Sequence, residues 1–146
     1  MDNTLTKIDQ IAFVVNDMEK AKAVMKTLFG AEPDRENQAS TTRHRMAFYH
    51  FANIELELIL PDERTDTQKK FLEKHGQGIH HIRFDVSDYK KTTQDLASRG
   101  YPLLSETDSV RKEGVKVAFI NTEPDLGAYI ELINMQEALD KEENKR

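Results

Sequence analysis

The chain has 146 residues, of which 38% are hydrophobic and 32% are charged, and it contains no cysteine. Disulfides and thiolate metal sites are therefore excluded, and no apolar run approaches the roughly 20 residues that a membrane-spanning helix needs. The formal net charge of −5 argues against nucleic-acid or anionic-membrane partners. Since the N-terminus also lacks the basic and apolar segments of a signal peptide, we expect a soluble, cytoplasmic protein.

The first half of the chain has the pattern of a strand, a helix and three further strands. Apolar and β-branched residues predict a strand over 8–15, and the Asn-Asp pair after it is typical of a helix N-cap. Apolar residues at helical spacing predict a helix from Met18 to Leu28 that ends at Gly30. Three strands are predicted after it, near 32–36, over 45–51 and over 54–60.

The second half has the same order of elements. Strands are predicted over 79–86, 102–106, 115–121 and 128–134, with a helix over 89–98. We expect an α+β fold of two tandem βαβββ modules that form a curved, half-open barrel sheet around a metal cleft. The chain is expected to be a single domain, with module 1 over about 7–61, a linker helix over about 65–76, module 2 over about 78–135 and a flexible tail over 136–146.

The two halves also repeat in sequence, which is strong evidence for a duplicated architecture. Residues 8–17 return as 79–88, and Met46-Ala47-Phe48 returns as Val117-Ala118-Phe119, both 71 residues later. Residues 56–59 return as 130–133 after a longer second turn. The repeat pairs polar residues that lie inside apolar strands, namely Gln10 with His81 and Glu57 with Glu131.

These four polar residues are predicted to face away from the helices, because side chains alternate across a strand. In a half-open barrel that face is concave, so the four can converge. Two carboxylates in a partly dry cleft repel each other and are poorly solvated, and a divalent cation removes that penalty. Amide, imidazole and carboxylate ligands suit zinc, nickel, cobalt or manganese, with positions left for water or substrate. The predicted ligands are Gln10, Glu57, His81 and Glu131.

With these residues in view, the chain resembles the vicinal oxygen chelate (glyoxalase/bleomycin resistance/dioxygenase) superfamily, in its glyoxalase I and methylmalonyl-CoA epimerase branch. The resemblance covers residues 7 to 135 and is most specific over 70–82, which is very similar to the corresponding stretch of methylmalonyl-CoA epimerases. The family ligand positions fall on the same four residues. Epimerases usually have histidine at the first position, where this chain has Gln10. The set Gln, Glu, His, Glu is that of zinc-type glyoxalase I enzymes.

The resemblance implies a metal-dependent isomerase or lyase that moves a proton at a carbon next to a carbonyl, with the metal acting as a Lewis acid. It makes Glu131 the first candidate for the base and Glu57 the second. Thiohemiacetals or acyl-CoA thioesters are the implied substrates, and a homodimer is the implied assembly. The alternatives are a drug-sequestering binding protein without a metal and, less favoured because Gln10 replaces a histidine, a metal-dependent dioxygenase.

Each of these residues also has a structural interpretation. Taken alone, Gln10 could be a hydrogen-bonded structural residue, and Glu57 could be a solvated position on an open sheet. His80 is expected to be structural, beside a His81 that binds the metal. Arg83 either binds a substrate carboxylate or phosphate, or pairs with Asp85 or Glu55 as scaffold. Phe48 and Tyr129 are candidates for contact with substrate, or ordinary core residues. Three further histidines are expected at surface or turn positions, namely His44, His50 and His75.

Overall fold

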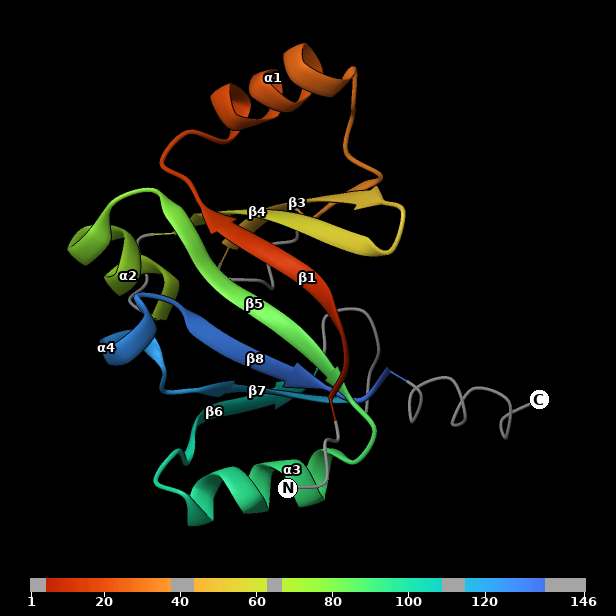
Figure 1. The fold of residues 1–146 in the computed structure, drawn as a ribbon. Coiled ribbons are helices and arrows are strands. Elements are labelled where there is room, and N and C mark those ends of the chain that lie inside the picture. Colours follow the sequence, from red (N-terminus) through yellow and green to blue (C-terminus); the bar gives the residue numbers. More distant parts are fainter. Residues whose placement is uncertain (1–4, 38–43, 63–66, 109–114, 136–146) are drawn as a thin grey trace. The chain divides into compact units, whose positions relative to one another are not determined.

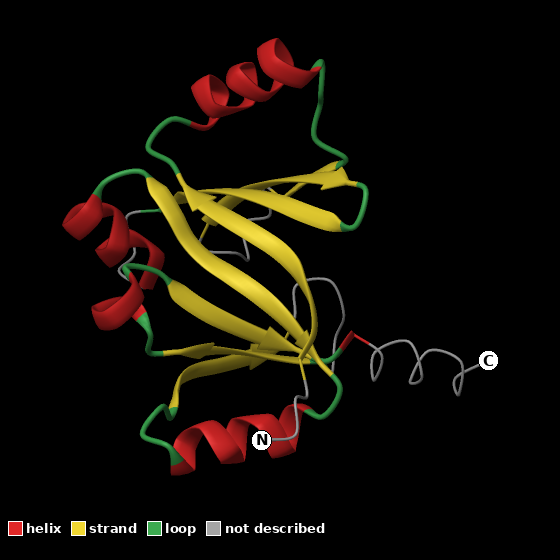
Figure 2. Ribbon diagram, viewed as in Figure 1, coloured by secondary structure: helices red, strands yellow, loops and turns green. Residues whose placement is uncertain are grey.

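The computed structural model describes residues 5–37, 44–62, 67–108 and 115–135. Figures 1 and 2 show the helices and strands of this part of the chain. The elements are β1 (Leu5–Val14), α1 (Met18–Phe29), β2 (Arg35–Asn37), β3 (His44–Phe51), β4 (Ile54–Pro61), α2 (Thr67–His75), β5 (Gly78–Val86), α3 (Tyr89–Ser98), β6 (Leu103–Asp108), β7 (Lys116–Ile120), α4 (Glu123–Leu126) and β8 (Tyr129–Ile133). The predicted α+β class and βαβββ order of both halves are confirmed, and the predicted tail over 136–146 lies outside the described residues.

The strands are hydrogen-bonded in the order β2-β3-β4-β1-β5-β8-β7-β6. The chain divides into two compact units, and the division falls inside β1 and β5 rather than at the linker helix. The first unit is Gln10–His81, and the second joins the residues up to Asp9 with those from Ile82 onward. The expectation of a single domain with a boundary near α2 stays a prediction.

The first unit buries its helix against one face of its strands. In β1 and β4, Phe13 and Leu58 point to the same side as Val15 and pack with Met18 and Met25 of α1, as the alternation predicted. Asp17 caps α1 by accepting a hydrogen bond from the Lys20 N–H at 3.0 Å, and Gly30 ends the helix in the left-handed region at φ 62°, where glycine has no steric penalty.

The second unit repeats this packing with other side chains. Phe84, Val86 and Leu132 pack with Tyr89 and Leu96 of α3. Asp88 accepts from the Lys91 N–H at 3.0 Å and caps α3, just as Asp17 caps α1. The helix-side faces assigned from the sequence are therefore confirmed in both units.

Residues that repeat in the sequence also have equivalent cross-strand partners in the two units. In the first unit Phe48 lies opposite Glu57 across the antiparallel β3–β4 pair, and in the second Phe119 lies opposite Glu131 across β7–β8.

The longer second turn contains α4, a short helix that the sequence analysis missed. Thr122 stabilises this turn, because its hydroxyl donates to the Ala128 carbonyl at 2.8 Å and accepts from the Ile130 N–H at 2.9 Å.

Within the described ranges, the helices are too short or too polar to cross a membrane.

Candidate functional site

Three of the four predicted ligands meet in the first unit. Gln10 comes from β1, Glu57 from β4 and His81 from β5, and their side chains are 3%, 5% and 3% exposed. His81 Nε2 lies 3.1 Å from Gln10 Oε1 and 3.7 Å from Glu57 Oε2. The cluster therefore brings an imidazole nitrogen, an amide oxygen and a carboxylate oxygen to one buried point.

A second carboxylate holds the other end of the Gln10 amide. The parallel β1–β4 register sets Gln10 opposite Glu55, and Gln10 Nε2 donates to Glu55 Oε1 at 2.9 Å. Glu55 Oε2 accepts from the Arg35 guanidinium at 3.3 Å. That guanidinium lies 3.7 Å from the centre of the Phe48 ring, so a cation–π contact stabilises Arg35 in this position.

His80 supports His81 from the other side. Their Nδ1 atoms lie 2.7 Å apart, so one ring donates and the other accepts. His80 is fully buried and packs edge-on against Phe71 at 5.1 Å. Burial, reinforced by the charge of His44, lowers the pKa of His80 to about 4, so His80 is neutral at pH 7. This environment supports the structural role expected for His80.

The cluster fits a divalent metal ion in both geometry and chemistry. Ligand atoms about 2.0–2.2 Å from one zinc ion are about 3 to 3.5 Å apart, close to the 3.1 and 3.7 Å separations measured from His81 Nε2. Ligation through Nε2 puts the ring proton of His81 on Nδ1, where His80 accepts it, and such a hydrogen bond orients metal-bound histidines. In the part of the chain that the structure describes, no three His, Asp or Glu side chains group to hold a metal by themselves; here the third donor is an amide.

The second unit contains a different buried cluster, built around Arg83 of β5. Arg83 is 3% exposed and donates to both Asp9 oxygens, at 2.8 Å from Nε and 3.4 Å from the terminal nitrogen. Glu131 Oε1 lies 3.8 Å from the guanidinium. Burial raises the pKa of Glu131 to about 7, a rise that Arg83 opposes and Asp9 reinforces. A carboxyl group with this pKa is half-ionised near neutral pH, which suits a proton-transfer group.

The remaining predicted site residues have packed neighbours. Phe48 is 1% exposed and lies under Arg35. Tyr129 packs edge-on against Phe119 with ring centres 5.9 Å apart. Arg83 has Asp9 as its closest described ion-pair partner, instead of the Asp85 or Glu55 named from the sequence. Their contacts with substrate stay predictions, as does the fourth ligand Glu131, which belongs to the second unit.

The sequence analysis missed Arg35 and Asp9, and it named Glu55 only as a possible partner of Arg83. The position of Glu55 beside Gln10 could have been suspected, because Glu55 lies two residues before Glu57 and shares its strand face. Arg35 lies in a strand whose pattern was weak. Asp9 carried no signal, since strict alternation puts it on the face opposite Gln10.

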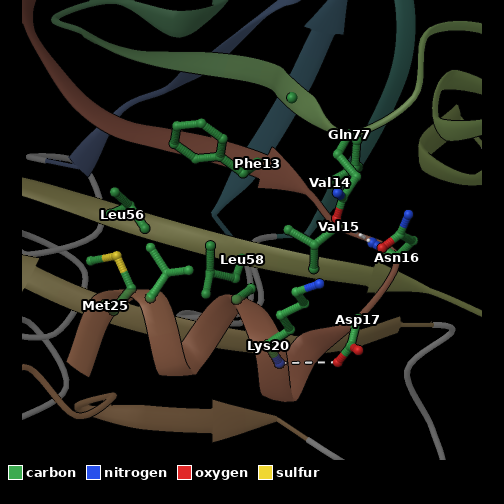
Figure 3. A pocket seen from close by; sticks show the side chains of 13 residues that line it. Phe13, Val14, Val15, Asn16, Asp17, Lys20, Met25, Leu56, Leu58 and Gln77 are labelled. Atoms are coloured by element: carbon green, nitrogen blue, oxygen red, sulfur yellow. Dashed lines mark hydrogen bonds between the residues drawn. The ribbon is translucent and has the colours of Figure 1, made fainter. Parts of the chain in front are cut away.

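A pocket of about 640 Å³ lies elsewhere in the first unit. Figure 3 shows Met25 of α1 and Leu58 of β4 between the helix and the strands, with Lys20 and Asp17 near the helix start. The pocket is lined by residues of α1, by the segment that leads into it and by the helix-side residues of β1 and β4, and by none of the predicted site residues. Alternation explains this, because neighbouring strand residues point to opposite faces.

Residues 9–119 match the family model of the Glyoxalase/Bleomycin resistance protein/Dioxygenase superfamily. The chain therefore belongs to this superfamily, and the resemblance noted in the sequence is confirmed.

Two curated relatives match most of the chain. An uncharacterised protein of Bacillus subtilis (strain 168) is 27% identical, covering 88% of this chain and 91% of that protein. The mitochondrial methylmalonyl-CoA epimerase of Homo sapiens is 28% identical, covering 88% and 73%.

Solved structures of two epimerases share the fold. The methylmalonyl-CoA epimerase of Mycobacterium tuberculosis is similar at a TM-score of 0.75 and 22% identity, covering 92% of this chain and 91% of that one. A variant of the Streptomyces coelicolor epimerase in complex with 2-nitronate-propionyl-CoA is similar at a TM-score of 0.73 and 22% identity, covering 89% and 94%.

Proposed function

We propose that the protein is a metal-dependent enzyme that moves a proton at the carbon next to the thioester carbonyl of an acyl-CoA, as methylmalonyl-CoA epimerases do. The observation that carries the proposal is the convergence of Gln10, Glu57 and His81 on one buried point, at 3.1 and 3.7 Å from His81 Nε2. Membership of the superfamily and similarity to the human epimerase support it. The neighbour bound to 2-nitronate-propionyl-CoA supports the substrate class.

The three residues of the first unit would hold the ion, and Glu131 is proposed as the fourth ligand on the sequence repeat alone. When bound, a divalent cation supplies stabilisation of the negative charge that develops on the carbonyl oxygen. Zinc, nickel, cobalt and manganese stay the candidate ions. His80 would keep the His81 ring in place, since its Nδ1 lies 2.7 Å from that of His81.

Glu131 is the first candidate to remove the proton from the α-carbon, with Glu57 second. In this proposal the α-proton moves to the Glu131 carboxylate, which passes it to water, and a proton from water added to the opposite face inverts the carbon. The buried environment of Glu131 suits the role, because a base works best when its pKa lies near the working pH. Arg83 is buried and paired with Asp9, which supports the scaffold interpretation over binding of a substrate carboxylate.

Glyoxalase I chemistry is the second candidate, and Gln10 is the observation that favours it, because the ligand set Gln, Glu, His, Glu resembles that of zinc-type glyoxalase I. The human relative and the two solved structures named above favour the epimerase. A binding protein without a metal is the third outcome that an experiment must distinguish.

The test is an assay of protein stripped with a chelator and reloaded separately with zinc, nickel, cobalt or manganese. Methylmalonyl-CoA is supplied in D₂O, and mass spectrometry measures deuterium at the α-carbon; a methylglyoxal–thiol adduct is the parallel substrate. Metal-dependent exchange that is lost in His81→Ala and kept in the exposed-histidine control His50→Ala is expected. Turnover of the thiol adduct alone would move the assignment to glyoxalase I, and failure to bind any of the four metals would favour the binding protein.

We also propose that the enzyme is a homodimer acting in the cytoplasm, as the resemblance and the sequence led us to expect. Apolar side chains exposed on α1 support self-association, since Val24 is 50% and Leu28 and Phe29 are each 65% exposed. Light scattering after size-exclusion chromatography tests this, and a monomer at micromolar concentration would contradict it.

A further inference from the structure

Gln10 is the unusual member of the metal cluster, because its side chain has two chemically different ends. The amide carbonyl oxygen can bind a cation, whereas the NH₂ group is a donor only and repels one. A histidine at this position would present a ring nitrogen in either orientation of the ring. A glutamine serves as a ligand only when the oxygen faces the ion, so something must fix the amide.

The contacts of the Gln10 amide show that Glu55 fixes its orientation. Gln10 Nε2 donates to Glu55 Oε1 at 2.9 Å, and Gln10 Oε1 lies 3.1 Å from His81 Nε2. In the flipped amide, Oε1 would face a carboxylate oxygen that has no proton to share, and the NH₂ group would face His81. An ionised carboxylate only accepts hydrogen bonds, so Glu55 permits one orientation of Gln10.

Glu55 is itself held in place. It is 4% exposed, its second oxygen accepts from Arg35 at 3.3 Å, and the Arg35 guanidinium lies over the Phe48 ring at 3.7 Å. The parallel register of β1 and β4 sets Glu55 directly opposite Gln10. Backbone pairing and an ion pair therefore both keep this carboxylate against the NH₂ end of the amide.

We infer that Glu55 is a positioning residue for metal binding: by taking the NH₂ group of Gln10, it turns the amide oxygen toward His81 and Glu57, and so makes a glutamine usable as a ligand. This inference rests on the proposed function, because it assumes that the cluster binds a divalent cation. It assigns a role to the Glu55–Arg35 pair, which does not itself belong to the ligand set.

The test measures Co²⁺ and Zn²⁺ dissociation constants of purified protein by competition with a chromophoric chelator, together with the Co²⁺ absorption spectrum and the melting temperature of the metal-free protein. Glu55→Leu is expected to weaken metal binding by about 10- to 100-fold, as loss of a group that orients a ligand usually does. Glu55→Gln keeps an acceptor for the NH₂ group but loses the charge, so it is expected to bind metal more tightly than Glu55→Leu. Glu36→Gln is the matched control, because it removes a carboxylate of the same unit that pairs with Lys22.

A second background separates orientation from simple charge attraction. In Gln10→Glu both outer atoms of residue 10 are oxygens, so no orientation is needed. Adding Glu55→Leu there is expected to cause no further loss of affinity. A loss as large as in the Gln10 protein would overturn the inference and show that Glu55 acts only through its charge.

The remaining outcomes are also decisive. Unchanged metal affinity in a folded Glu55→Leu protein overturns the inference while leaving the proposed function intact. If Glu55→Leu does not fold, equal losses in Glu55→Gln and Glu36→Gln overturn it. Failure of the wild-type protein to bind either ion defeats the proposed function first.

Discussion

Glu57 and Glu131 occupy the same position in two copies of one module, opposite Phe48 and Phe119 respectively. Their polar neighbours differ in kind. Glu57 Oε2 lies 3.7 Å from the imidazole Nε2 of His81, whereas Glu131 faces the permanent positive charge of Arg83, which Asp9 also binds.

Duplication has therefore preserved the strand register while the chemistry of the buried face has diverged. An imidazole nitrogen and an amide oxygen each have a lone pair that can bind a metal ion, whereas a guanidinium has none. The first unit consequently has the donor set for an ion, and the second has an ion-pair cluster with a carboxyl group of raised pKa. The following experiments break or sharpen this comparison, beginning with the largest expected effect.

The catalytic difference between the two glutamates is tested by Glu131→Gln. We expect kcat for α-proton exchange to fall by about 10²- to 10⁴-fold, the usual contribution of a general base, while bound metal measured by mass spectrometry stays within the range of the wild-type protein. Exchange at the wild-type rate would remove Glu131 from the mechanism. Loss of the metal together with activity would make it a ligand without a demonstrated role as base.

The structural role of the second cluster is tested by Arg83→Met. Removing the guanidinium leaves Asp9 and Glu131 buried without their cation, which is expected to cost about 3–5 kcal/mol of unfolding free energy, measured by urea denaturation. Lys116→Met is the control, because its ion pair with Asp108 is half-exposed and such solvent-screened pairs contribute little to stability. In Asp9→Asn/Arg83→Met part of the loss should return, and equal effects of Arg83→Met and Lys116→Met would refute a structural role.

The two clusters are expected to give the metal-free protein opposite pH dependences. The pKa of Glu131 is raised from 4.5 to about 7, so the folded protein holds more protons than the unfolded one in this window and its stability falls as pH rises through it. The pKa of His80 is lowered from 6.5 to about 4, so the folded protein holds fewer protons there and its stability rises with pH between these values.

Chelator-treated variants separate these two contributions in urea titrations from pH 4 to 8. Glu131→Gln should remove the fall and leave a steeper net rise with pH, whereas His80→Asn should remove the rise. Unchanged pH profiles in both variants would show that neither group is shifted as described.

The smallest expected effect concerns a feature that the two units share. Asp17 and Asp88 cap their helices through the same contact at 3.0 Å, so Asp17→Ala and Asp88→Ala should each cost about 0.5–2 kcal/mol. Asp95→Ala, within α3, is the control and is expected to change stability by less than about 0.5 kcal/mol. A large difference between the two caps would mean that the units have diverged in more than their buried polar residues.

Much of the fold could be predicted because it depends on local rules. The period of two identified the strands and their helix-side faces, and Asp17 and Gly30 marked the ends of the first helix through capping chemistry. The helix predicted over 89–98 has the bounds observed for α3, and the linker helix predicted over about 65–76 contains α2, which spans 67–75. The helix α4 was missed because four residues that include a proline show no helical period.

The sequence by itself determined the duplicated architecture and the face on which Gln10, Glu57 and His81 lie, because strand alternation and a repeat are properties of chain order. Only the tertiary structure decided which polar groups touch. The β1–β4 register set Glu55 against Gln10, and the pairing of Arg83 with Asp9 joined residues 74 positions apart. Hydrogen bonds between strands depend on distances of tenths of an ångström across the fold, and no local pattern along the chain encodes them.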